Sequence, residues 1–175
     1  MERANCPSGG NLPKGFLAPT RMIPISQRNP NQHYPNTLNP IVTPGDFCTV
    51  FNLEVPPSAF GKNCSLEFLF PSFPQTLSPT LFNGPGHFTF HPYAIGAGGN
   101  DKTTYNNQPP PFQFPIPPQT FTPGHAYVID NNPCGIPQTT TNTIVSGAFC
   151  SDDTTLSYLQ TSKLGCPIGF YLLNL

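Results

Sequence analysis

Tyrosine and amide side chains gather in two long segments of the chain, residues 93–111 and residues 27–45. The candidate ligand-binding residues in these segments are Tyr93, Tyr105, Asn106, Asn107 and Tyr34, with Gln108 and His33 beside them. Aromatic rings stack on the C–H faces of sugars, and amide groups form hydrogen bonds with sugar hydroxyls. A polysaccharide is therefore one candidate ligand. The competing interpretation is that the tyrosines only cover the ends of the folded domain.

Six cysteines form the second set of residues with chemistry of their own. They are Cys6, Cys48, Cys64, Cys134, Cys150 and Cys166. None belongs to a C-x-x-C pair and none lies at zinc-finger spacing, so we expect disulfides rather than a zinc site. An even number of widely spaced cysteines is typical of secreted proteins, so we expect an extracellular or cell-wall location. The spacing leaves the pairing of the cysteines open.

The remaining polar residues form no recognisable catalytic or metal site. His87 and His91 would share one face of a strand but lie ~13 Å apart, too far to bind one ion. Asp101, Asp152 and Asp153 lack the spacing of a calcium-binding loop. The G-x-S-x-G motif of serine hydrolases is missing, and no motif brings two carboxylates together. We therefore expect no catalytic residues, no metal and no cofactor.

Composition narrows the class of partner. Charged residues make up 9% of the chain and the net charge is −1, which excludes the basic surface that nucleic-acid binding needs. No segment reaches the ~18–20 apolar residues of a membrane span. Asn63 begins the sequon Asn-Cys-Ser and is a candidate for glycosylation. The expected partner is cell-wall polysaccharide or another surface protein.

Proline and phenylalanine set the fold class. The 25 prolines restrict helices, and the 15 phenylalanines supply the apolar bulk that a disordered chain lacks. We predict an all-β fold, an antiparallel β-sandwich of immunoglobulin-like or jelly-roll-like type, with about eight or nine short strands stapled by disulfides. Residues 1–14 would form an N-terminal arm, and residues 15–175 a single domain with long loops at about 27–45 and 93–111.

The central expected strand is Gly61–Pro71, in which the side chains on one face, from Cys64 to Phe70, are apolar. Residues 51–56 alternate in the same way, so we expect two antiparallel strands joined by Pro-Pro-Ser-Ala-Phe-Gly. Pro24 would place the first strand at a sheet edge. The full set of expected strands is Arg21–Ser26, Asp46–Val55, Gly61–Pro71, His87–His91, Phe112–Phe121, Ala126–Asp130, Thr143–Cys150, Thr154–Gln160 and Ile168–Leu173.

Residues 121–127 read Phe-x-Pro-Gly-x-x-Tyr. Pro123 and Gly124 occupy the positions that a type II turn requires. In sandwich domains such a pattern places a tyrosine corner, whose hydroxyl bonds back across the turn. Tyr127 would be that structural tyrosine.

Four segments of the chain, in order, resemble one known family. They are Phe51–Pro71, Gly84–Phe90, Phe121–Cys134 and Pro167–Tyr171. Together they resemble the fungal But-two C-terminal domain family, over a region from about residue 20 to the C-terminus. The resemblance implies a mostly secreted or wall-associated fungal protein, and it provides no catalytic residues. It also implies that Cys64 pairs with Cys134.

The leading hypothesis is a non-catalytic, secreted protein of the fungal surface or cell wall that binds wall polysaccharide. The But-two family is named after a yeast protein that binds a component of the ubiquitin-like activation machinery. The alternative is therefore a protein-interaction module for a host target or for that pathway. A glycan-active enzyme is the third hypothesis.

Overall fold

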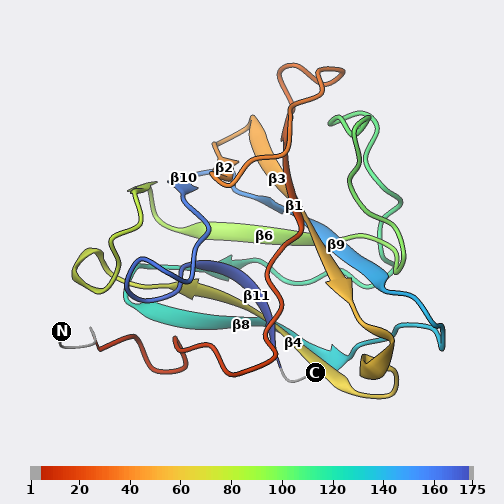
Figure 1. The fold of residues 1–175 in the computed structure, drawn as a ribbon. Coiled ribbons are helices and arrows are strands. Elements are labelled where there is room, and N and C mark those ends of the chain that lie inside the picture. The colour runs from red at the N-terminus through yellow and green to blue at the C-terminus, as the bar shows by residue number, and fades with distance from the viewer. Residues whose placement is uncertain (1–4, 174–175) are drawn as a thin grey trace.

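The computed structural model describes residues 5–173 and is all-β in this region, with three antiparallel sheets (Figure 1). The strands are β1 Arg21–Ser26, β2 Ile41–Val42, β3 Phe47–Val55, β4 Asn63–Phe70, β5 Thr80–Asn83, β6 His87–Pro92, β7 Gln119–Thr120, β8 His125–Pro133, β9 Thr143–Cys150, β10 Thr155–Tyr158 and β11 Gly169–Leu173. Two short 3-10 helices, η1 Pro57–Ala59 and η2 Phe73–Gln75, complete the regular elements. The predicted antiparallel β-sandwich is confirmed.

Two sheets pack face to face and a third caps their core. The five-stranded sheet has the order β1-β3-β9-β6-β7, and the sheet β11-β4-β8 lies against it (Figure 1). The small sheet β2-β10-β5 adds Val42, Leu156 and Tyr158 to the same core. Because every strand alternates, one face of each sheet supplies this core.

Phe68 on β4 lies at the centre of the core and is fully buried. Its ring centroid is 4.9 Å from that of Phe170, 5.2 Å from that of Phe121 and 5.4 Å from that of Phe149. Phe68 and Phe170 belong to one large sheet, Phe149 belongs to the other, and Phe121 follows β7, so aromatic contacts fix the distance between the layers. The alternation read from residues 64–70 therefore predicts the buried face correctly.

The expected connection between residues 51–56 and 61–71 is wrong in one respect. β3 pairs with β1 and β9, whereas β4 pairs with β11 and β8, so the two strands lie in different sheets. The prolines and the 3-10 helix η1 carry the chain from one layer to the other. Alternation alone cannot distinguish such an arch from a hairpin, because both bury one face of each strand.

The described part of the chain, residues 5–173, contains eleven strands, more than the expected eight or nine. β2 and β5 lie in segments that the sequence predicts as loops, and β2 is only two residues long. Conversely, the expected strand Phe112–Phe121 is reduced to β7, Gln119–Thr120. Pro115, Pro117 and Pro118 explain the loss, since proline has no N–H to donate to a ladder. Pro24 does lie on an edge strand, as predicted, because β1 ends the five-stranded sheet.

Three disulfides connect the described cysteines: Cys6–Cys166, Cys48–Cys150 and Cys64–Cys134. The last is the pair that the family resemblance implies. It joins the start of β4 to the residue after β8, and Cys48–Cys150 joins the neighbouring strands β3 and β9. Cys6–Cys166 ties the N-terminal arm to the segment before β11. Each bond contributes about 2–4 kcal/mol by restricting the unfolded chain.

Tyr127 bonds across its turn. Its hydroxyl accepts a hydrogen bond from the N–H of Thr122 at 2.8 Å and donates to the carbonyl of Thr122 at 3.1 Å. Gly124 has a φ of 100°, the left-handed conformation that this turn requires and that glycine adopts without strain. The turn holds Phe121, whose ring stacks on Tyr127 with centroids 4.4 Å apart.

Candidate functional site

The two long loops meet on one side of the five-stranded sheet (Figure 1). The N–H of Asn106 donates to the carbonyl of Pro30 at 2.9 Å, and its side-chain amide donates to Asn31 Oδ1 at 3.0 Å. His33 Nδ1 lies 2.8 Å from the carbonyl oxygen of Thr103. Segments that are far apart in the sequence therefore form one surface.

A buried asparagine anchors loop 93–111 to the sheet. Asn52 on β3 donates to the carbonyl of Gly99 at 2.8 Å and accepts from its N–H at 2.9 Å. A Cβ on the adjacent Gly98 would lie 2.6 Å from a methyl carbon of Ile144. The run of glycines after Tyr93 thus allows the loop to lie directly on the sheet.

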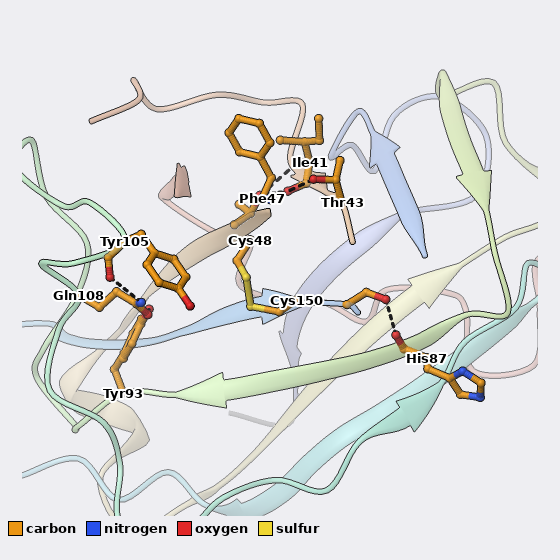
Figure 2. Close-up of a disulfide and its surroundings, with 11 residues drawn as sticks. Ile41, Thr43, Phe47, Cys48, His87, Tyr93, Tyr105, Gln108 and Cys150 are labelled. Atoms are coloured by element: carbon orange, nitrogen blue, oxygen red, sulfur yellow. Dashed lines mark hydrogen bonds between the residues drawn. A yellow bond between two sulfur atoms is a disulfide. The ribbon is translucent and has the colours of Figure 1, made fainter. Parts of the chain in front are cut away.

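The structure gives the five predicted ligand-binding residues different surroundings. Tyr93 is buried, its hydroxyl donates to Gln108 Oε1 at 2.7 Å, and burial raises its pKa. Tyr105 is half-buried beside it (Figure 2). The side-chain amides of Asn106 and Asn107 bond within the two loops. Tyr34 packs edge-to-face on Phe47 with ring centroids 5.3 Å apart.

Tyr93 and Tyr105 line a groove of about 420 Å³, which we call the outer groove. Figure 2 shows the Cys48–Cys150 disulfide between these two tyrosines and the β2–β3 turn. Asn106, Asn107 and Tyr34 do not line the groove. Two of the five predicted residues are therefore brought together, and the other three shape the loops around them.

The rim of the outer groove is polar and carries negative charge. Besides the two tyrosines, its polar lining residues are Gln27, Thr43, Asp46, His91, Gln108, Ser151 and Asp152, and no lysine or arginine lines it within the described residues. Partial burial lowers the pKa of His91, and the nearby Asp152 partly offsets that effect. A neutral imidazole results at neutral pH, which can donate one hydrogen bond and accept another.

A serine, a histidine and an aspartate lie close together next to the groove but do not form a catalytic triad. His87 Nδ1 lies 2.5 Å from Asp153 Oδ2, and this contact holds the pKa of Asp153 below its usual value. The hydroxyl of Ser151 donates to the backbone carbonyl of His87 at 2.6 Å. Activating a serine requires an imidazole nitrogen to accept its proton, so this arrangement positions a turn instead.

Residues 5–173 contain no cluster of three or more side chains that could hold a metal ion. The same region has no helix of the length and apolarity that crossing a bilayer demands. Asn63, the sequon residue, is exposed at the start of β4.

A second hollow, the inter-sheet cavity, lies between the two large sheets and measures about 580 Å³. Its walls are mostly core side chains, among them Phe51, Leu66, Phe90, Val145, Phe170 and Leu172. Its outer side is formed by the strap, residues 111–118, through Phe112, Phe114 and Ile116. The sequence analysis missed this cavity because it assigned the strap to a strand. The sequence did contain a signal against a strand here: the three apolar residues are interleaved with prolines, which have no N–H to donate to a neighbouring strand.

The fold and these two hollows define a disulfide-stapled β-sandwich domain with room for ligands on both faces of one sheet. The family model described as the Ubiquitin 3 binding protein But2 C-terminal domain matches residues 17–163, so the chain belongs to this family. The resemblance seen in the sequence is thereby confirmed, although Pro167–Tyr171 lies beyond the matched residues. A comparison with curated protein sequences finds no significant match.

Proposed function

We propose that this protein is an extracellular, non-catalytic binding domain of the fungal surface or cell wall. The observation that carries the location is the set of three disulfides, with no free cysteine among the described residues. Reducing compartments keep thiols free, whereas secreted proteins retain their disulfides. The proposed fungal surface or cell wall rests on the family resemblance in the sequence. The description of the family names a binding protein rather than an enzyme.

The ligand we propose for the outer groove is an uncharged wall polysaccharide. Tyr105 offers a half-buried ring for stacking, and Gln108 and the neutral imidazole of His91 offer hydrogen-bond partners for hydroxyls. The two aspartates on the rim, Asp46 and Asp152, can accept further hydrogen bonds from hydroxyls. Because no lysine or arginine among residues 5–173 lines the groove, these aspartates disfavour an anionic glycan.

The test is retention of the protein on insoluble chitin, β-glucan and mannan. We expect one of these polymers to retain the wild-type protein and Tyr105→Ala to reduce the retained fraction severalfold. The matched control is Phe73→Ala, which removes an exposed ring from η2 in the chain that follows β4. Retention on none of the three polymers, or equal retention of both variants, would refute the polysaccharide proposal.

A protein partner is the second candidate, and exposed apolar side chains favour it. Leu38, Leu77 and Leu81 are between 57% and 79% exposed and belong to or adjoin the small sheet and its connections. The family description speaks of ubiquitin 3 binding. A partner in that pathway would meet the domain in a reducing compartment, so a count of thiols in the denatured, unreduced protein separates the two candidates. Six free thiols would overturn the extracellular proposal.

A further inference from the structure

The inter-sheet cavity has the size and lining of a small-molecule site. Its volume of about 580 Å³ falls in the ~300–1,000 Å³ range of such sites. Its mostly apolar walls predict an apolar occupant.

The strap leaves its own apolar side chains incompletely covered. Phe112 and Phe114 both line the cavity, yet 36% and 65% of their surfaces remain exposed. Their rings contact each other edge-to-face at 5.7 Å, and the N–H of Phe112 donates to the carbonyl of Pro92 at 2.9 Å. The strap is therefore fixed at one end while its aromatic side chains lie between the cavity and solvent. An apolar ligand would bury surface that the folded protein leaves exposed.

A β-bulge aims polar groups into the cavity. The pairing of β4 with β8 shifts register between Leu66 and Glu67, so Leu66 faces Asp130 while Glu67 faces Val128. Ile129 is the extra residue, and both Ile129 and Asp130 consequently lie on the core side of β8. Without the bulge, Asp130 would point to the opposite face. Gln119 on β7 holds the bulge by donating to the carbonyl of Ile129 at 3.4 Å.

Asp130 determines which polar headgroup a ligand of the inter-sheet cavity can carry. One carboxylate oxygen, Oδ1, accepts a hydrogen bond from Asn132. Within residues 5–173 no group bonds the other oxygen, Oδ2, and no basic side chain lines the cavity. The free oxygen can accept a hydrogen bond from a hydroxyl. The same charge repels a carboxylate or phosphate headgroup.

We propose that the inter-sheet cavity binds an uncharged apolar alcohol, with its hydrocarbon part between the sheets and its hydroxyl donating to Asp130 Oδ2. The strap covers the hydrocarbon part through Phe112 and Phe114. This site shares only Pro92 and Tyr93 with the lining of the outer groove, and its ligand is proposed independently of the polysaccharide.

The first test is isothermal titration of the disulfide-intact protein at pH 7 with 1-octanol and 1-decanol. Saturable binding with one site is expected, and Kd should fall about fifteenfold from octanol to decanol, because each buried methylene contributes about fourfold. Octanoate and decanoate should bind more weakly than the alcohols of equal length. Absence of saturable alcohol binding would overturn the proposal.

Two variants assign the binding to this cavity. Asp130→Asn removes the charge but keeps an acceptor, so decanoate should bind at least about fivefold more tightly while decanol changes little. Val145→Phe adds a ring to a wall of the cavity on β9, so it should abolish alcohol binding while thermal unfolding shows a folded protein. Phe73→Ala is the control and should bind like the wild type. The assignment would be refuted if Val145→Phe bound the alcohols as the wild type does. It would also be refuted if Asp130→Asn bound decanoate no more tightly than the wild type.

Discussion

The outer groove and the inter-sheet cavity occupy opposite faces of the same two strands. Cys48 of β3 and Cys150 of β9 line the groove, whereas Leu53 of β3 and Val145 of β9 line the cavity. Successive side chains of a strand point to opposite faces of the sheet, so one pair of strands can line two sites that bind chemically different ligands. The outer face has a polar rim, and the inner face is almost entirely apolar. A single pair of neighbours, Pro92 and Tyr93, lines both hollows.

The largest loss of stability should come from a substitution in the hydrophobic core between the sheets. Phe68→Ala removes the central ring and should lower the free energy of unfolding by about 3–5 kcal/mol. Denaturant unfolding followed by fluorescence measures the loss. The control Phe73→Ala should stay within about 0.5 kcal/mol of the wild type, because that side chain is exposed. A loss below about 1 kcal/mol would mean that the core is not organised around this ring.

Removing each of the two disulfides that line the hollows should show whether the outer groove and the inter-sheet cavity bind independently. Cys48→Ala with Cys150→Ala removes the bond under the outer groove, and Cys64→Ala with Cys134→Ala removes the one that lines the cavity. Each double variant should lose about 2–5 kcal/mol of stability. At temperatures where both remain folded, the first should weaken polymer retention and the second should weaken decanol binding. If both variants changed both ligands equally, the two hollows would be one coupled site.

Tyr93→Phe tests the shared wall more finely. The phenol hydroxyl donates to Gln108 on the groove side, while the ring lines both hollows. Removing only the oxygen should cost about 0.5–1.5 kcal/mol of stability and release Gln108. Polymer retention should fall and decanol affinity should stay the same. An equal loss of both ligands would show that the hydroxyl supports the cavity as well.

The smallest effect concerns pH and the rim of the groove. Because burial lowers the pKa of His91, the unfolded chain binds a proton at that residue before the folded chain does. Stability should therefore decline as pH falls from neutral through the usual histidine value of about 6.5. His91→Gln should flatten this decline in unfolding midpoints measured from pH 8 to pH 5. A slope that is unchanged in the variant would place the effect on another group.

The local alternation of apolar and polar residues predicted most of the fold. It could not predict which strands, far apart in the sequence, pair with one another. The alternation of residues 64–70 identified the buried face of β4 correctly, since period-two patterns survive in any sheet arrangement. That β3 pairs with β9, about 95 residues away, has no local signature. The outer groove depends on this pairing, so the sequence could name Tyr93 and Tyr105 but not the disulfide beside them. The position of Asp130 on the cavity side of β8 depends on a bulge that no residue type in that strand predicts.

The three disulfides also have a topological consequence, because they are nested. Cys64–Cys134 lies within the loop closed by Cys48–Cys150, which lies within the loop closed by Cys6–Cys166. A protease that cuts once in the exposed part of loop 93–111 acts inside all three rings. The two fragments would remain one covalent molecule, separable only after reduction. In surroundings rich in secreted proteases, a nicked chain of this kind would keep both halves of its sandwich in place.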